Sequence, residues 1–263
     1  IIVMSVMNGF KTDLTKKILG LNPHIVIQSN SSKINDLFIK ELKEKIKNIS
    51  ISKTYSGEGI VVSDQNAKGI IVKGIDSTNK EGLKILEKNV LKNDINKFKK
   101  NTAFIGAELA FNLNLKVGDK INLMSSTFVT TPFGGLPKQE VLTISGVFTT
   151  GFYEFDNNFV FLNLSDALSL FDKEEYQQNL EIYLDNPMEA DIFKNKIQKL
   201  NQNYYVYSWS DLNKTFFSAL KVERNVMFII LTLILIVAAF NIISGLTILI
   251  KNKTKEIAIL KTL

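Results

Sequence analysis

The longest apolar segment of the chain runs from Met227 to Ile250 and contains no charged side chain. As a helix rising about 1.5 Å per residue, it is long enough to cross a hydrocarbon core of roughly 30 Å. Ser208 and Asp211 resemble a capping box, and from there to about Ile257 no Pro and only Gly245 interrupts the pattern. We therefore expect one continuous helix, in which residues 211–226 form a stalk, 227–250 a transmembrane helix and 251–263 a cytoplasmic segment.

A second apolar run opens the chain and continues with Phe10 and Leu14, which follow the four-residue spacing of a helix face. Gly20 and the following Pro23 are typical of a helix C-terminus. This pattern predicts that residues 1–20 are the end of a first transmembrane helix and its stalk. Because the run begins in mid-pattern and without a start Met, we expect the chain to be a piece of a longer protein.

Between these two helices the pattern alternates between strand and helix. Residues 24–76 and 178–209 each contain a strand, an amphipathic helix and at least one further strand. The expected elements are strands at 25–27, 60–62, 70–75, 180–184 and 204–207, and helices at 34–46 and 190–200. These two β-α-β parts are predicted to form, with the segment between them, a two-lobed extracytoplasmic domain.

Residues 77–177 lie between the two parts, and their pattern is mainly β from Thr102 to Phe171. The expected elements are a helix over 78–98, short helices near 108–113 and 165–171, and turns at 117–119 and 134–135. The fold class expected for the whole chain is α+β. It combines split β-α-β units with a β-rich insertion, carried on long transmembrane and stalk helices.

Composition and charge narrow the function classes. The chain has 263 residues, 45% hydrophobic and 22% charged, with 4 Pro, as in globular proteins with one apolar helix added. The net charge of +6 does not indicate nucleic-acid binding, because the lysines are mixed with Asp and Glu, as in residues 40–47. Lys251, Lys253 and Lys255 follow the apolar segment closely, so its C-terminal side is expected to be cytoplasmic and the domain to lie outside.

The residues of most enzyme sites are missing from the chain. There is no cysteine, and His24 is the one histidine, which excludes a thiolate metal site and an HExxH zinc site within the chain. At the start of a predicted strand, His24 is interpreted as structural. Gly69 and Gly74 have the spacing of a P-loop, but Ile75 and Asp76 follow where Lys and Ser or Thr are needed. We expect no enzyme activity, cofactor or metal on this chain.

Four short motifs stand in order along the chain: VMSVMNGF at residues 3–10, ILGLNPH at 18–24, AAFNII at 238–243 and KEIAILKT at 255–262. Together they resemble the permease subunits of the lipoprotein-releasing ABC transporter, which form the LolC/LolE family within the MacB/FtsX-like permease superfamily. Each motif alone is weak. Their order and spacing around an extracytoplasmic domain make the resemblance specific, and it covers the whole chain.

The resemblance implies a multi-pass subunit with four transmembrane helices in the bacterial inner membrane and a large domain in the periplasm. It implies that outer-membrane lipoproteins pass from the inner membrane to a soluble periplasmic carrier, while ATP and Mg bind to a separate ATPase subunit. The implied partners are that ATPase, a second permease subunit in a homo- or heterodimer, the carrier, the lipoprotein substrate and membrane lipids, with no nucleic acid.

A loop in the hairpin expected at residues 125–140 is similar to the hook by which LolC-type subunits recruit the carrier. The matching residues are Thr131, Pro132, Phe133, Gly134, Gly135, Leu136 and Pro137. The two prolines fix φ and stiffen the loop, while Phe133 and Leu136 offer apolar anchors. A long solvated hairpin loop is the alternative interpretation. The loop favours a LolC-like subunit or a hybrid permease that replaces a LolC and LolE pair.

Two further sites are expected at the membrane. Lipoprotein is expected to enter between the two membrane helices, beside Met4, Met7, Val226, Met227 and Ile230. The alternative is that these side chains pack against the helices that are missing from this chain. The cytoplasmic segment is expected to contact the ATPase through Lys255, Glu256, Ile257, Leu260 and Lys261.

Two other functions remain open. A MacB-like efflux subunit or an FtsX-like regulator of cell-wall hydrolases shares the stalks and the separate ATPase but carries no such hook. A membrane receptor with an extracytoplasmic sensor domain would continue after Lys251 into a signalling coiled coil or kinase, whereas residues 256–263 are compact and apolar.

Overall fold

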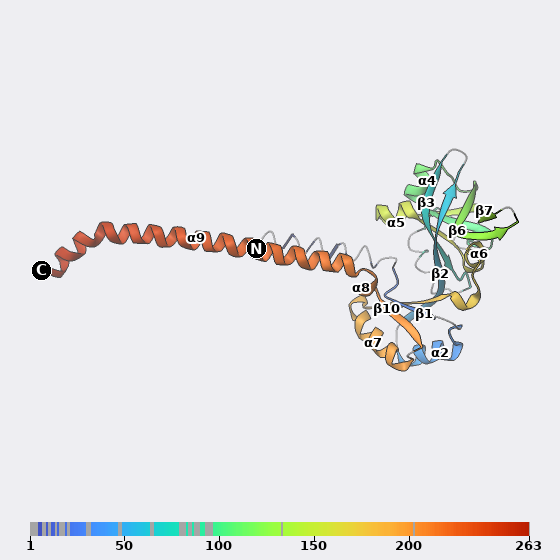
Figure 1. The fold of residues 1–263 in the computed structure, drawn as a ribbon, viewed down its shortest axis with the longest axis horizontal. Helices are drawn as coiled ribbons and strands as arrows, with labels where there is room; N and C mark the ends of the chain where they lie inside the picture. Colours follow the sequence, from blue (N-terminus) through green and yellow to red (C-terminus); the bar gives the residue numbers. More distant parts are fainter. Residues whose placement is uncertain are drawn as a thin grey trace. The chain divides into compact units, whose positions relative to one another are not determined.

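A computed structural model gives the fold of the chain (Figure 1). It describes residues 22–29, 33–46, 49–63, 66–78, 90–92, 97–132, 134–201 and 203–262, and the single residues Ser5, Val6, Gly9, Thr12, Asp13, Thr15, Leu19, Leu83 and Leu86. Of these, the side chains of 90–92, 129, 131, 255–257, 260 and 262 are not described. The chain divides into two compact units, Ile1–Leu212 and Asn213–Leu263.

The first unit combines helices and strands, and the second is one helix. The strands are β1 (Ile25–Ser29), β2 (Ile49–Val62), β3 (Ala67–Ile75), β4 (Val90–Lys92), β5 (Thr102–Gly106), β6 (Lys120–Thr131), β7 (Gly134–Phe148), β8 (Phe159–Asn163), β9 (Asn179–Leu184) and β10 (Tyr204–Ser208). The α-helices are α2 (Asp36–Lys45), α4 (Ala107–Asn112), α5 (Tyr153–Asn158), α6 (Leu164–Leu170), α7 (Ala190–Leu200), α8 (Trp209–Leu212) and α9 (Lys214–Thr262). Short 3-10 helices η2 (Glu175–Gln177) and η3 (Pro187–Glu189) precede β9 and α7.

Two interleaved β-α-β units form one end of the first unit. Strands β10, β1, β9 and β2 lie side by side in that order with antiparallel neighbours, so each unit, β1-α2-β2 and β9-α7-β10, encloses a strand of the other. Helices α2 and α7 lie on the same side of β1 and β10 (Figure 1). The packing is direct, since the rings of Phe38 on α2 and Tyr204 on β10 have centroids 4.9 Å apart. The split β-α-β arrangement expected from the sequence is confirmed.

Six strands of the first unit pair in a closed ring. β2 pairs with β3, β3 with β8, β8 with β5, β5 with β7, β7 with β6, and β6 returns to β2. Alternate residues of these strands share one buried apolar cluster: Val61, Ile70, Val72, Ala103, Ile105, Ile121, Leu123, Leu142, Ile144, Val160 and Leu162. The ring is therefore a small barrel filled by side chains, and its closure removes most exposed strand edges.

Strand β2 belongs to both the β-α-β units and the barrel. Its first part, Ile49–Thr54, pairs with β9, and its second part, from Thr54 onward, pairs with β3. The sequence suggested that a separate insertion begins after residue 76. The structure instead has one continuous sheet, in which β2 connects the β-α-β units to the barrel. The expected division into two lobes is not confirmed, because the sheet is continuous through β2 and residues Ile1–Leu212 form one compact unit.

A buried ion pair lies beside β2 where the two parts meet. Lys73 Nζ on β3 lies 2.9 Å from Glu181 Oε2 on β9, and both side chains are more than nine-tenths buried. The hydroxyl of Tyr183 donates to the same Glu181 oxygen at 2.8 Å. Burial, reinforced by the charge and hydrogen bond of Glu181, raises the pKa of Tyr183 well above its ordinary value. This pair joins the strands on either side of β2 and had no signature in the sequence.

Several element boundaries differ from those expected. Leu83 and Leu86 are helical, but Val90–Lys92 form β4, which pairs with β7, so the predicted helix over 78–98 does not extend through this segment. The remaining residues of that prediction lie mostly outside the described residues. A continuous helix from Ser208 is also wrong, because α8 ends at Leu212 and a turn at Asn213 separates it from α9.

The second unit consists of helix α9, which has 49 residues. Residues Lys214–Thr254 are long and apolar enough to cross a membrane, and no other helix among the described residues meets this test. Its large apolar side chains are exposed, including Val226 at 47% and Ile230 at 44%. An exposed apolar surface of this length fits a lipid environment or a neighbouring helix.

Candidate functional site

The hairpin of β6 and β7 projects from the first unit (Figure 1). The two strands pair from Lys120↔Thr143 to Thr131↔Gly134, and they extend beyond the other strands (Figure 1). Gly134 has a φ of 115°, in the left-handed region that favours glycine, and it follows the turn at exposed Pro132. The hairpin and its Gly134 turn stand where the sequence predicted them.

A β-bulge marks the point where the hairpin leaves the barrel. The register of β6 on β7 shifts between Met124 and Phe128, and the last pair of β6 with β2 is Gly59↔Ser125. The Ser125 hydroxyl accepts a hydrogen bond from the amide of Thr127 at 3.2 Å, which fixes the bulge. Beyond Ser125, the described residues of β6 and β7 pair only with each other as far as Gln139, so residues 126–132 and 134–139 form a two-stranded ribbon.

The ribbon is attached at its base by polar contacts. The Asn122 side chain donates to Gln139 Oε1 at 2.9 Å, across the two strands. Lys138 Nζ lies 3.3 Å from Asp172 Oδ1, just after the end of α6. These contacts hold the base of the ribbon, and they favour a fixed direction for it.

The ribbon exposes apolar side chains on both of its faces. Leu136 is 57% exposed and Phe128 is 66% exposed. Because facing residues of paired strands share a face and successive residues point to opposite faces, Phe128 lies with Pro137 on one face and Leu136 lies on the other. A Cβ built on Gly135 would lie 3.5 Å from that of Phe128, so the ring covers this glycine. Exposed aromatic and aliphatic side chains on a pre-formed ribbon are suited to protein binding.

Phe128 was not among the residues chosen from the sequence. An apolar residue in a predicted strand is usually interpreted as core, and its exposure follows only from the end of the β2–β6 pairing at Ser125. Of the chosen residues, Thr131 ends β6, Pro132, Gly134 and Leu136 are exposed, and Pro137 is half-buried. Phe133 lies outside the described residues. A role for these residues in binding stays a prediction.

The other chosen residues lie on α9 or outside the described residues. Met4 and Met7 lie outside the described residues, while Val226 and Ile230 are exposed and Met227 half-buried along α9. At the C-terminal end of α9, four of the chosen residues are helical without described side chains: Lys255, Glu256, Ile257 and Leu260. Lys261 is exposed. The proposed lipoprotein path and ATPase contact stay predictions.

His24 has the structural place expected for it. Its Nδ1 accepts a hydrogen bond from the amide of Leu184 at 2.8 Å, and its own amide donates to the Ile182 carbonyl at 3.0 Å. The ring packs edge-on against Tyr183, with centroids 5.8 Å apart. Burial lowers the pKa of the imidazole below its ordinary value of 6.5. No group of acidic or histidine side chains among the described residues is placed to hold a metal ion.

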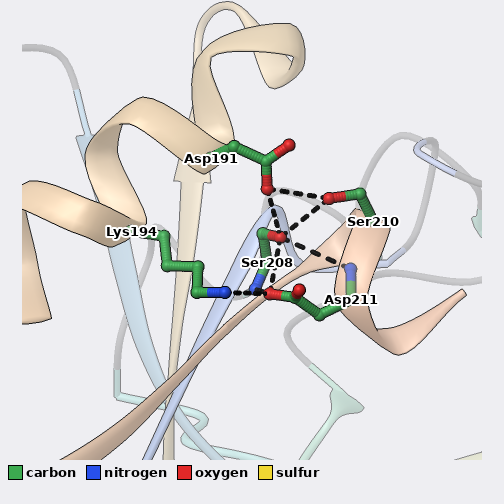
Figure 2. Close-up of polar contacts among 5 residues, drawn as sticks. All are labelled: Asp191, Lys194, Ser208, Ser210 and Asp211. Carbon is green, nitrogen blue, oxygen red and sulfur yellow. Dashed lines mark hydrogen bonds and ion pairs between the residues drawn. The ribbon is translucent and has the colours of Figure 1, made fainter. Parts of the chain in front are cut away.

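A polar cluster lies where β10 leads into α8 (Figure 2). The buried hydroxyl of Ser208 lies 2.5 Å from Asp191 Oδ1 and 2.9 Å from Asp211 Oδ2. The Ser210 hydroxyl donates to Asp191 at 2.7 Å, and Lys194 Nζ lies 2.7 Å from Asp211 Oδ2. Burial raises the pKa of Asp211, but hydrogen bonds from Lys194 and Ser208 outweigh it and leave the pKa below its ordinary value.

Comparisons with known proteins show the family to which the chain belongs. The family described as MacB-like periplasmic core domain matches residues 1–200. The lipoprotein-releasing system transmembrane protein LolC of Neisseria meningitidis serogroup B is 30% identical over all of this chain and 65% of its own length. The corresponding LolE protein of Haemophilus influenzae is 26% identical over all of this chain and 65% of its own length.

Among solved structures, the periplasmic region of MacB from Actinobacillus actinomycetemcomitans gives a TM-score of 0.45 at 12% identity, covering 76% of this chain and 95% of that one. The chain spans about 65% of the length of the curated relatives named above. The similarity to LolC and LolE extends over the whole chain, and the resemblance inferred from the four short motifs is confirmed.

Proposed function

This chain belongs to the family of MacB-like periplasmic core domains, and from that premise we propose that it is part of an ABC transporter permease that releases lipoproteins. In this proposal, outer-membrane lipoproteins leave the bacterial inner membrane and are handed to a soluble carrier in the periplasm. Similarity to LolC and LolE along the entire chain supports this substrate class over the efflux or hydrolase-regulating functions of the wider superfamily.

The observation that carries the proposal is the two-stranded ribbon beyond Ser125. It presents Phe128 and Leu136 to solvent on a backbone already held by the bulge and by the Lys138–Asp172 ion pair. A pre-formed ribbon loses less conformational entropy when a partner binds than a free loop would. Such a projection suits the capture of a second protein, and we assign it to the periplasmic carrier.

Helix α9 supports the membrane part of the proposal. Its apolar segment would cross the inner membrane, with the first unit in the periplasm and the residues after Lys251 in the cytoplasm. In the whole subunit we propose further membrane helices and a second permease subunit beside this one. ATP would bind to a separate ATPase that contacts Glu256 and its neighbours, so this chain itself would carry no cofactor and no catalytic residue.

The proposal is tested with the complete permease, its ATPase and the carrier in proteoliposomes that contain a lipid-anchored lipoprotein. A photocrosslinker replacing Leu136 should label the carrier, whereas the same group at Leu37, 70% exposed on α2, should not. Replacing residues 128–137 by a short turn should stop transfer of lipoprotein to the carrier. Undiminished transfer by that variant, together with no labelling from Leu136, would exclude the proposed function of the ribbon.

A further inference from the structure

The polar cluster of Figure 2 holds α8 more firmly than helix formation requires. Ser208 and Asp211 form a reciprocal cap, since the Ser208 amide donates to Asp211 Oδ2 at 2.9 Å and the Asp211 amide lies 3.4 Å from Ser208 Oγ. That cap is enough to begin a helix. Two more contacts, Ser210 to Asp191 and Asp211 to Lys194, tie the same helix sideways to α7.

Further contacts tie α8 to the residue that precedes β1 and to η3. The Trp209 amide donates to the His24 carbonyl at 2.9 Å, and the indole Nε1 donates to the Pro187 carbonyl at 2.8 Å. Trp209 is 7% exposed and Ser208 is fully buried. A helix of four residues is unstable by itself, so its position is set by these contacts with β1, α7 and η3.

The place of the cluster in the chain gives it a mechanical role. After Leu212 and the turn at Asn213 the chain continues directly into α9, and before Ser208 it is β10, which pairs with β1 along its whole length. A displacement at the start of α9 that travels along the chain therefore passes through α8 before it reaches the sheet. If α8 could swing freely, the displacement would end there.

We propose that Asp191, Lys194, Ser208, Ser210 and Asp211 form a rigid joint, which passes movement of the membrane helix into β10 and β1. This inference rests on the proposed function, because it presumes that ATP turnover by a partner moves the helix. The five are positioning residues that act through α8 and touch no substrate. Coupling of this kind needs a connected, stiff element between the two ends, and the contacts with α7 supply it.

The joint can be weakened without removing its cap. The double variant Lys194→Met/Ser210→Ala deletes both lateral contacts with α7 and keeps the Ser208–Asp211 pair. Lys33→Met is the matched control, since it removes an ion pair of similar length, 2.8 Å to Glu175, at an exposed site elsewhere on the first unit. Lys194→Arg should preserve the contact with Asp211 and rescue coupling.

The experiment uses the complete transporter in proteoliposomes and measures lipoprotein released per ATP hydrolysed. We expect this ratio to fall at least about fivefold in the double variant, the low end of typical coupling between sites, with ATP hydrolysis continuing. The Lys33→Met and Lys194→Arg variants should keep the original ratio. If the double variant does not assemble, Ser210→Ala alone takes its place, with a smaller decrease expected. If the double variant kept the ratio of the unaltered protein, the proposed joint would be wrong, even if the melting temperature of the variant were lower.

A second measurement separates failure of the joint from failure of the proposed function. Hydrogen–deuterium exchange of the β1 and β10 amides is compared with and without ATP in the same complexes, which needs no lipoprotein. ATP should change exchange in the unaltered protein and in Lys33→Met, but much less in the double variant. An equal response in all variants, or none in the unaltered protein, would refute the joint whatever the transporter carries.

Discussion

Ile25 and Ser208 face each other across the antiparallel pair of β1 and β10. Ile25 begins β1 and Ser208 ends β10, so the chain enters and leaves this sheet at adjoining positions. The contact of the Trp209 amide with the His24 carbonyl closes the same corner. Both connections of the domain to the rest of the chain are thus held by one small group of residues, and the sheet between them is complete without α9.

Residues 22–212 should therefore fold alone as a soluble monomer. A fragment ending at residue 209 should be less stable, because it loses Asp211 and with it the side chain that accepts from the Ser208 amide. The fragment also loses the contacts of Ser210 with Asp191 and of Asp211 with Lys194, and a single hydrogen bond of this kind is worth about 1 kcal/mol. Urea unfolding of the two fragments, followed by circular dichroism, measures the difference. Aggregation of the longer fragment, or equal midpoints for both, would contradict this account.

The buried Lys73–Glu181 pair should be sensitive to loss of one partner and tolerant of losing both. Glu181→Gln leaves the Lys73 charge buried without its carboxylate, and breaking such a pair typically lowers the free energy of unfolding by about 3–5 kcal/mol. Replacing both residues by Met and Leu should lower it by much less than the two single changes together. Urea midpoints of fragment 22–212 provide the test.

Lys33→Met serves as the control for that series, because it breaks an ion pair that is exposed on both sides. It should leave the midpoint unchanged, as most exposed ion pairs contribute little. A double variant at Lys73 and Glu181 that is as unstable as the sum of its single changes would show that the two side chains act independently.

Local patterns in the sequence were sufficient for elements whose signal lies within the element. The helix expected at 190–200 is α7 with the same limits, since Ala190 and Ile197 mark its buried face and Asn201 ends it. The hairpin of β6 and β7 was found from its prolines and glycines. In each case, turn chemistry or periodicity over a few residues decides the structure.

Long-range pairing decided the features that the sequence did not reveal. Closure of the barrel depends on β6 meeting β2, for example through Ile60↔Met124, and no local pattern encodes that contact. In the joint, Ser208 and Asp211 could be recognised as a cap, but Asp191 and Lys194 arrive from α7 only in the folded unit. The end of α8 before Asn213 follows from these tertiary contacts, because nothing in the sequence there breaks a helix.

Phe128→Ala and Leu136→Ala should each weaken carrier binding by about one to two decades in affinity. Full burial of such a side chain in a complex is worth roughly 1.5–3 kcal/mol, and about 1.4 kcal/mol corresponds to tenfold. Val141→Ala is the matched control, since Val141 is 64% exposed on β7 but pairs with Asn122, before the bulge. Calorimetric titration of the carrier into fragment 22–212 measures each affinity.

ATP hydrolysis by the complete transporter should be unchanged in the two ribbon variants, because neither side chain belongs to the membrane helix or the cytoplasmic segment. Equal loss of affinity in Val141→Ala would mean that the carrier also binds the barrel wall. Unchanged affinity in both ribbon variants would contradict binding by the ribbon.

His24 should make the stability of the domain depend on pH. Burial holds the pKa of its imidazole below the ordinary value of 6.5, so the unfolded chain takes up a proton at a higher pH than the folded one. Stability contributed by the neutral ring is therefore complete above pH 6.5 and is lost as pH falls from there toward the lower pKa of the folded state.

Protonation of His24 would also remove the acceptor for the Leu184 amide, leaving that donor buried without its partner. The free energy of unfolding of fragment 22–212 should accordingly rise as pH increases from the folded-state pKa to 6.5, and His24→Asn should flatten this rise because its side-chain oxygen accepts without titrating. A rise of the same slope in the Asn variant would assign the dependence to other groups.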